Sequence, residues 1–367
     1  MQLDLNQFDL DSPQEQEIHS VLQKIATGPE LSKDISFAEA RAVTSNILDS
    51  RINPIRAALF FLALRMKRET DEENRGILSA IKDFTRPVTC MADEVVDIAE
   101  PYSGYNRTLT PTPFLPMVLA ACGLTTVSHG VVSCSPKFGV THKQILDAAG
   151  VNTNLSLEEA ALKADNDGWA YVDQSQFCPK LHALLDLRKL IIKRLPLTTV
   201  ETVVGPVRGR TKTHLITGYV HKPYPPVYTS LARHSGFDSA LIIRGVEGGI
   251  VPSLRQSSIS YYYHDNEELT EIAHNPEELG IRQENRSVNL PDESWATPTN
   301  NKQIAMATAK LGLEALAGVK GPTYDALVYS ASLILWHVKK ISSIANAASE
   351  VRKVLDSGQA QDIIKTA

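Results

Sequence analysis

The stretch that decides the fold runs from Asp97 to Gly139 and reads DIAEPYSGYNRTLTPTPFLPMVLAACGLTTVSHGVVSCSPKFG. It starts inside an apolar, strand-like segment, passes through a turn-rich loop, and continues as a helix-like run from Phe114 to Cys122. A short second strand, Leu124 to Val127, leads into another polar loop. An α/β domain presents a ligand site in this order, at the carboxyl ends of its strands. We therefore predict an α/β domain whose site includes these two loops.

The residues before this stretch have a helical pattern. Capping residues and periodic apolar positions predict four helices in the first 86 residues: one from Glu15 to Ala26, one after the capping box of Ser36 and Glu39, one opening at Asn53-Pro54, and one after the capping box of Thr70 and Glu73. The third helix carries Leu59, Phe60, Phe61 and Leu62, which is more apolar surface than a small helical unit can bury. This surplus predicts a homodimer through the N-terminal helices.

From Pro87 onward, short β-branched runs alternate with helical patterns. Prolines at 111, 113 and 116 place the start of the first helix near Thr112, because proline is tolerated only in a first turn. Ser156 and Glu159 cap a further helix. The remaining predicted elements are a long amphipathic helix from Lys180 to Arg194, strands at 169–172, 214–220, 240–243 and 258–263, a helix at 225–234, and three closing helices at 301–317, 322–338 and 343–357.

Whole-chain composition narrows the class of protein. The 367 residues carry a net charge of −5, which does not indicate a nucleic-acid binder, although a local basic face is compatible with it. The N-terminus is polar and acidic, unlike a signal peptide, and no apolar run is long enough to span a bilayer. The four cysteines form no Cys-x-x-Cys pair, so we expect reduced thiols, no zinc site and a cytoplasmic location.

Several short motifs occur in one order along the chain: ALRMKRET at 63–70, DIA at 97–99, AACG at 120–123, HG at 129–130, NPEELG at 275–280 and GVKGP at 318–322. Together they resemble the anthranilate phosphoribosyltransferases of glycosyltransferase family 3. The resemblance implies an α/β fold with a separate all-helical N-terminal domain, a nucleoside phosphorylase/phosphoribosyltransferase class II-like architecture. It divides the chain into a helical dimerisation domain, 1–86 plus about 180–202, and an α/β domain, 87–179 and 203–367.

The first loop departs from the family's pyrophosphate loop, Gly-Thr-Gly-Gly-Asp-Gly. Glycines there let backbone N–H groups approach phosphate oxygens. In this chain Glu100 adds negative charge and Pro101 removes a donor. The candidate ligand-binding residues that remain in and after this loop are Ser103, Gly104, Thr108, Thr110 and Thr112, with helix capping as the alternative role of the threonines.

The second and third loops depart from the family as well. The second keeps His129-Gly130 but has Ser128 where the family has lysine, so the candidates there are Ser128, His129, Gly130 and Ser135, with a structural turn as the alternative for His129. In the third loop the family's Asp-Glu metal pair falls on Ile250-Val251, which cannot bind Mg²⁺. We predict no metal site and no cofactor, with Mg²⁺ required only if phosphoribosyl pyrophosphate still binds, and we assign no catalytic residue.

Changes in three loops indicate that the original reaction is not retained. Arg244-Gly245-Val246-Glu247-Gly248 resembles a non-biosynthetic branch of the family, some members of which bind nucleic acid. One hypothesis is therefore a protein that binds a small anionic ligand or nucleic acid in the cleft between the domains. The other is an active pentosyltransferase with an unknown acceptor, anthranilate being the least favoured. Whether the chain is an enzyme stays open at this point.

A run of cations suggests where nucleic acid would bind. Tyr102 and Tyr105 are the rings available for base stacking in this hypothesis. The alternative is a solvated helix face with scattered ion pairs. The cations are expected to border the cleft, and the last three are included among the candidate ligand-binding residues: Arg188, Lys189, Lys193, Arg194, Arg208, Arg210 and Lys212.

Overall fold

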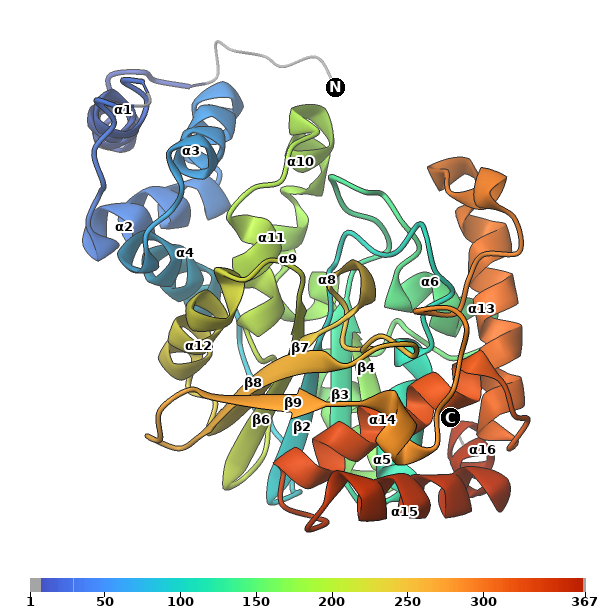
Figure 1. The fold of residues 1–367 in the computed structure, drawn as a ribbon. Helices are drawn as coiled ribbons and strands as arrows, with labels where there is room; N and C mark the ends of the chain where they lie inside the picture. The colour runs from blue at the N-terminus through green and yellow to red at the C-terminus, as the bar shows by residue number, and fades with distance from the viewer. Residues whose placement is uncertain (1–7, 29, 366–367) are drawn as a thin grey trace.

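The computed structural model describes residues 8–28 and 30–365 and has two parts (Figure 1). The N-terminal part is a bundle of four helices, α1 (Pro13–Ile25), α2 (Phe37–Leu48), α3 (Pro54–Lys67) and α4 (Asp71–Asp83). The second part is a sheet with helices on both faces. Residues 1–7, with which the predicted helical domain begins, lie outside the described residues.

The starts of α2, α3 and α4 are as predicted, whereas α1 begins at Pro13, two residues before the predicted Glu15. Ser36 and Thr70 each accept a hydrogen bond from the backbone N–H three residues later, and the glutamates at those positions return one. Asn53 caps α3, whose first residue is Pro54. These caps satisfy N–H groups that have no partner inside a helix, which is why they could be located from sequence.

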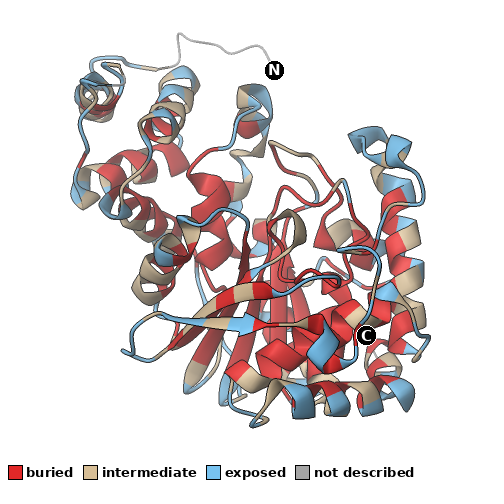
Figure 2. Ribbon diagram, viewed as in Figure 1, coloured by how far each residue is buried: buried red, intermediate tan, exposed pale blue. Residues whose placement is uncertain are grey.

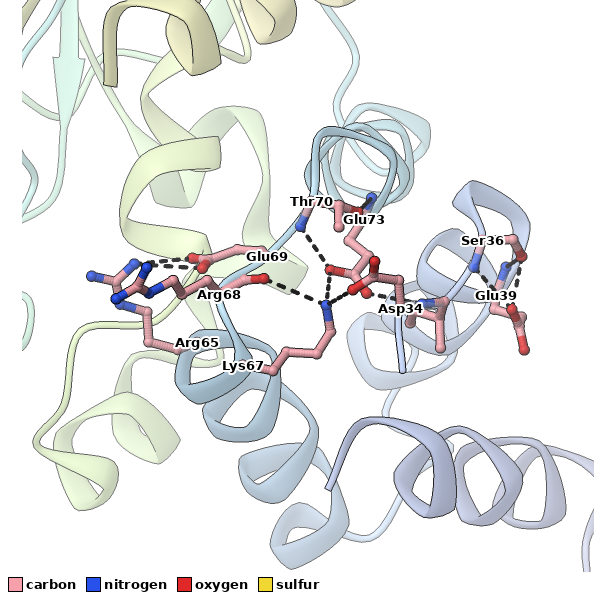
Figure 3. Close-up of polar contacts among 10 residues, drawn as sticks. Asp34, Ser36, Glu39, Arg65, Lys67, Arg68, Glu69, Thr70 and Glu73 are labelled. Carbon is pink, nitrogen blue, oxygen red and sulfur yellow. Dashed lines mark hydrogen bonds and ion pairs between the residues drawn. The ribbon is translucent and has the colours of Figure 1, made fainter. Parts of the chain in front are cut away.

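A buried lysine joins three segments of the bundle (Figure 3). Lys67, at the end of α3, donates to Asp34 at 2.6 Å and to Glu73 at 2.7 Å. Glu73 also accepts from the backbone N–H of Ile35 and of Thr70. The carboxylate of Glu73 thus acts both as the capping group of α4 and as the counter-ion of Lys67, which fixes the angle between the third and fourth helices.

The large sheet has the strand order β4-β3-β2-β6-β7-β8-β9. The strands from β4 to β7 run parallel, whereas β8 and β9 are antiparallel additions at one edge. A second, two-stranded sheet pairs β1 (Val88–Thr89) with β5 (Val207–Arg208). The bounds in the large sheet are β2 Glu94–Ala99, β3 Thr126–Gly130, β4 Trp169–Asp173, β6 Lys212–Tyr219, β7 Ser239–Arg244, β8 Ser258–His264 and β9 Thr270–His274.

Apolar residues cover both faces of the sheet, as expected for a parallel sheet buried on both sides (Figure 2). In β2, Val95 and Ala99 belong to one core, and Val96 and Ile98 belong to the other. The first core continues into the N-terminal bundle and includes α7 (Leu157–Asp167) and α12 (Tyr224–Ser235). The second is covered by α5 (Leu115–Ala121), α6 (His142–Ala148), α13 (Asn301–Leu316), α14 (Pro322–His337), α15 (Ile344–Asp356) and α16 (Gln359–Lys365).

The prediction of one long helix from Lys180 to Arg194 is wrong. The segment is divided into α9 (Pro179–His182) and α10 (Leu185–Ile191), after the short α8 (Gln174–Phe177) and before α11 (Leu197–Val200). Ile192 adopts a left-handed conformation and ends α10. Arg188, expected to border the cleft or else to lie on a solvated helix face, is buried against Glu201. The chain is divided here because it carries this arginine inward instead of continuing along one straight amphipathic helix.

Within the described residues, none of the helices combines the length and the apolar character needed to cross a membrane.

Candidate functional site

A pocket of about 350 Å³ lies at the carboxyl edge of the sheet. The ends of β2 and β6 line it through Ala99 and residues 217–219. The facing residues come from the segment after α10 and from α12 and include Arg194, Thr198 and Tyr224. This is the edge at which α/β sheets bind their ligands. We call this hollow the edge pocket.

A second hollow of about 710 Å³ adjoins the edge pocket. Arg107, Val220 and Glu247 line both hollows and form the rim between them. The rest of its lining comes from the end of β7, from residues 253–258 and from residues 284–289. The two hollows together make one continuous concave surface.

The first loop is filled by its own side chains. Glu100 is buried and accepts hydrogen bonds from the Tyr105 hydroxyl at 2.5 Å, from His142 Nε2 at 2.8 Å and from the Ile250 backbone N–H at 2.8 Å. Burial alone would raise the pKa of Glu100, but these donors outweigh it and hold the pKa below its ordinary value. The carboxylate therefore stays charged and occupies donors that an anionic ligand would otherwise use.

The third loop has a glycine at the place where these side chains of the first loop pack against it. A Cβ atom added at Gly249 would lie 2.0 Å from the Tyr105 hydroxyl oxygen and 2.8 Å from Glu100 Oε1. Only glycine leaves room for these two side chains. The glycine of the third loop thus makes space for a tyrosine of the first.

A second carboxylate, Glu247, ties the first loop to the third. It accepts from the Arg107 backbone N–H at 2.9 Å, from the Thr108 hydroxyl at 3.0 Å and from the Asn106 backbone N–H at 3.4 Å. Lys137 donates to it at 3.5 Å. Glu247 adopts a positive φ of 55° at this position. Glu247 thus acts as an internal anion for the backbone amides of the first loop.

The second loop contains a buried chain of polar groups. His129 Nε2 lies 2.9 Å from Asp97 Oδ1, and its Nδ1 contacts the Tyr102 hydroxyl. Burial raises the pKa of Tyr102 well above its ordinary value, so the phenol keeps its proton and can donate it to Nδ1. Both tyrosine rings proposed for base stacking, Tyr102 and Tyr105, are buried, so that part of the hypothesis is wrong.

The residues at the family's metal positions do not fit Mg²⁺. Ile250 and Val251 are buried apolar side chains. The backbone N–H of Ile250 donates to Glu100, and its carbonyl accepts from the Ser330 hydroxyl. Glu247, the nearest carboxylate, is engaged by loop donors. Among residues 8–28 and 30–365, no group of three or more His, Cys, Asp or Glu side chains is arranged to hold a metal ion.

The candidate residues of the first two loops are only partly brought to the surface of the hollows. Ser103 lines the edge pocket, and Thr108 lines the second hollow. Gly104 forms a turn and its carbonyl accepts from Lys137. The others are buried beneath the hollows, where they can support the loops but not contact a ligand directly: Thr110, Thr112, Ser128, His129, Gly130 and Ser135.

Arg208, Arg210 and Lys212 do not border the cleft, contrary to expectation. They lie at the end of β5, in the turn after it and at the start of β6, whereas the pocket lies at the other end of β6. Arg208 donates to backbone carbonyls of residues 204, 205, 235 and 236, and Arg210 pairs with Asp93. Sequence proximity to the cleft-lining segment was misleading, because one eight-residue strand separates the two edges.

Sequence reasoning missed most residues that line the edge pocket. Arg194 was expected to border the cleft and does line the pocket, but the aromatic residues Tyr219, Tyr224 and Tyr228 were not considered. The end of β6 was a usable signal, since Tyr219 lies near the end of the strand predicted at 214–220 and is the last residue of β6. Tyr224 and Tyr228 are four positions apart on α12, so helical spacing places them on one face but does not show that this face lines the pocket.

Comparison with known proteins identifies relatives over nearly the whole chain. Residues 19–85 match the model of the helical bundle domain of a glycosyl transferase family, and residues 106–361 match the model of its a/b domain. An uncharacterised protein of Aquifex aeolicus is 24% identical over 88% of this chain and 93% of its own length. The anthranilate phosphoribosyltransferase of Petrotoga mobilis is 25% identical over 92% of both chains.

A solved structure confirms the architecture. The anthranilate phosphoribosyltransferase of Thermus thermophilus superimposes with a TM-score of 0.74 at 19% identity, over 95% of this chain and 97% of that one. The predicted α/β fold with a helical N-terminal domain is therefore confirmed.

Proposed function

Since the chain belongs to the glycosyl transferase family that joins a helical bundle to an α/β domain, as in the anthranilate phosphoribosyltransferases, we propose that it is a non-biosynthetic member that binds an anionic ligand in the cleft between these domains. The ligand is a small anion or nucleic acid. A location in the cytoplasm stays a prediction.

The observation that carries this proposal is the use of the loop donors by the protein itself. A pyrophosphate loop must offer free backbone N–H groups to its ligand. Here Glu100 occupies the N–H of Ile250, and Glu247 occupies the N–H of Arg107. With both acceptors charged and anchored, a pyrophosphate entering these loops would have to displace them. This supports binding without the family's transfer reaction.

The edge pocket itself keeps the means to bind an anion. Arg194 makes no ion pair with any described side chain and lies over the Tyr224 ring at 5.6 Å. Lys137 adds a second cation to the lining. A planar guanidinium suits carboxylate and phosphate oxygens. The same open pocket favours the second candidate function, transfer of a pentosyl group to an unknown acceptor.

Calorimetry with phosphoribosyl pyrophosphate separates these two functions. We expect the affinity to change by less than about threefold when Mg²⁺ is added, because neither buried loop position offers a metal ligand. We also expect no product from phosphoribosyl pyrophosphate and anthranilate. Strong tightening by Mg²⁺, or turnover of anthranilate, would overturn the proposal.

A pair of variants tests the pocket independently of turnover. Arg194→Gln is expected to weaken binding of inorganic pyrophosphate about tenfold, the typical loss of one charge-assisted hydrogen bond. Arg210→Gln is the control, because it removes the same charge at the opposite edge, where Arg210 pairs with Asp93. Equal losses in both variants would count against the edge pocket.

We also propose that the protein is a homodimer through its N-terminal helices, although not all of the residues expected at this contact are exposed. Phe60 and Phe61 are buried within the bundle, so they do not supply the surface. The exposed apolar residues of α3 are Ile55, Leu59 and Met66, with exposed fractions of 48%, 49% and 76%. Their spacing places them on one side of the helix.

Replacing Leu59 and Met66 together by aspartate is expected to give monomers at micromolar concentration, because charges would then face each other across the contact. Sedimentation velocity measures the change. Leu162→Asp is the control, since Leu162 is a comparably exposed leucine on α7, outside the bundle. A wild-type protein that sediments as a monomer would refute the dimer.

A further inference from the structure

The second hollow, described above beside the edge pocket, is lined by four arginines: Arg107, Arg244, Arg255 and Arg286. We call it the arginine groove. All four are exposed, and none forms an ion pair with a side chain in the described part of the protein. The groove contains two acids, and one of them, Glu247, is engaged by the amides of the first loop. The groove is therefore strongly positive in a chain whose net charge is −5.

The arginines come from four segments that backbone contacts hold together. The Leu254 N–H donates to the Arg286 carbonyl at 3.0 Å, and the Leu109 N–H donates to the Val288 carbonyl at 2.9 Å. Gly245 forms an antiparallel bridge with Pro252, next to Arg244. The four cations are thus positioned by a connected backbone, not by flexible chain ends.

Many cations elsewhere in this protein have acidic partners. Arg41 pairs with Asp83 and Arg210 with Asp93, although both are as exposed as the arginines of the groove. Like charges gathered in one hollow repel one another, at a cost that salt only partly screens. A ligand with several negative charges removes this repulsion and gains paired hydrogen bonds to each guanidinium. The charge pattern therefore fits a polyanion better than a single carboxylate.

We propose that the arginine groove binds a chain of phosphate groups, and that the ligand of the edge pocket extends into it across the rim formed by Arg107 and Glu247. This inference rests on the proposed function, because it extends the ligand of the same cleft. The groove is also lined by hydroxyl and amide groups, at Ser253, Ser257 and Asn285 among others, which can donate to phosphate oxygens. In the edge pocket, the half-buried Tyr224 offers its ring to the part of the ligand that carries no phosphate.

Two sources supply linked phosphates beside a ring: a free nucleotide-like metabolite and a single-stranded nucleic acid. Inorganic tripolyphosphate and a short single-stranded oligonucleotide probe them separately. The variant Arg244→Gln, Arg255→Gln, Arg286→Gln removes three charges from exposed side chains that no described group pairs with, so we expect it to fold normally. Its thermal unfolding midpoint checks this.

The control variant is Lys189→Gln, Lys193→Gln, Lys212→Gln. It lowers the net charge by the same three units, from −5 to −8, but none of its residues lines either hollow. At about 50 mM salt, the groove variant should bind tripolyphosphate at least tenfold more weakly than wild type, and the control should stay within about threefold. For the oligonucleotide, the slope of log affinity against log salt should fall by about two, since each neutralised phosphate contributes roughly 0.7.

The outcomes separate this inference from the proposed function. Suppose that Arg194→Gln weakens pyrophosphate binding while the groove variant binds both probes like wild type. Then phosphate binding by the arginine groove is refuted, and anion binding by the edge pocket is supported. If instead the groove variant loses binding while Arg194→Gln does not, phosphate binding by the arginine groove is supported and anion binding by the edge pocket is refuted. A wild-type protein that binds neither tripolyphosphate nor the oligonucleotide at low salt overturns the inference. Binding of tripolyphosphate alone identifies a free metabolite, and much tighter binding of the oligonucleotide identifies a strand.

Discussion

Replacing Arg188 by methionine is expected to lower the free energy of unfolding by about 3–5 kcal/mol, because it leaves Glu201 charged and unpaired in the interior. The two side chains are only 1% and 0% exposed, and two N–O contacts of 2.6 and 2.7 Å join them. Burial by itself would lower the pKa of Arg188, but the Glu201 carboxylate raises it above its ordinary value. Gln174 donates to Glu201 at 3.2 Å and cannot replace the lost charge.

Urea unfolding of three variants tests this expectation. Arg188→Met alone should have the lowest free energy of unfolding. The double variant Arg188→Met, Glu201→Met should recover much of the lost free energy, because it leaves no buried charge. Arg210→Met is the surface control, since its pair with Asp93 is exposed and should contribute less than about 1 kcal/mol. A single variant as stable as the double variant would mean that Glu201 is reached by water or takes up a proton without cost.

Acid is expected to destabilise the protein through its buried histidines, starting below pH 6.5. Burial lowers the pKa of His274 from 6.5 to about 4, while its ring contacts the Ser260 hydroxyl at 2.8 Å and the Tyr329 hydroxyl at 2.7 Å. Burial also lowers the pKa of His337, well below its ordinary value, and that of His214. Between pH 6.5 and 4, the unfolded chain binds protons that the folded chain does not, so stability falls as pH falls.

His274 alone should account for about 3 kcal/mol between these two pH values, at roughly 1.36 kcal/mol for each unit of pKa difference. Urea unfolding measured at a series of pH values provides the curve. In His274→Gln, the free energy of unfolding should depend on pH less steeply in this range, by about one proton. The control His221→Gln, at an exposed position, should keep the wild-type dependence. An unchanged curve in His274→Gln would show that the ring becomes protonated in the folded state.

The parts of the fold that sequence could locate are those set by local chemistry. Ser36 and Thr70 mark helix starts because a cap needs only residues a few positions apart. The apolar run at 95–98 marks a strand buried on both faces. Strand β9 (Thr270–His274) was missed because its exposed edge position permits charged residues such as Glu271.

The site was harder to predict because its decisive contacts join distant segments. Sequence showed that Glu100 departs from the family's first loop and that Glu247 belongs to the motif at 244–248, but not that each would accept hydrogen bonds from another part of the chain. It also could not distinguish the buried Arg188 from the exposed Lys189, since burial depends on Glu201, thirteen positions away. The arginines of the groove are scattered between positions 107 and 286 and form no motif.

The filling of the first loop also limits how this protein can evolve. A change of Glu100 to glycine would leave the Tyr105 hydroxyl, His142 and the Ile250 N–H buried without their acceptor. A side chain gained at Gly249 would collide with Tyr105. Each step back toward an open loop is thus destabilising until the others have occurred. Substitutions at Glu100, Tyr105 and Gly249 are therefore expected to be epistatic, because these residues are in contact with one another.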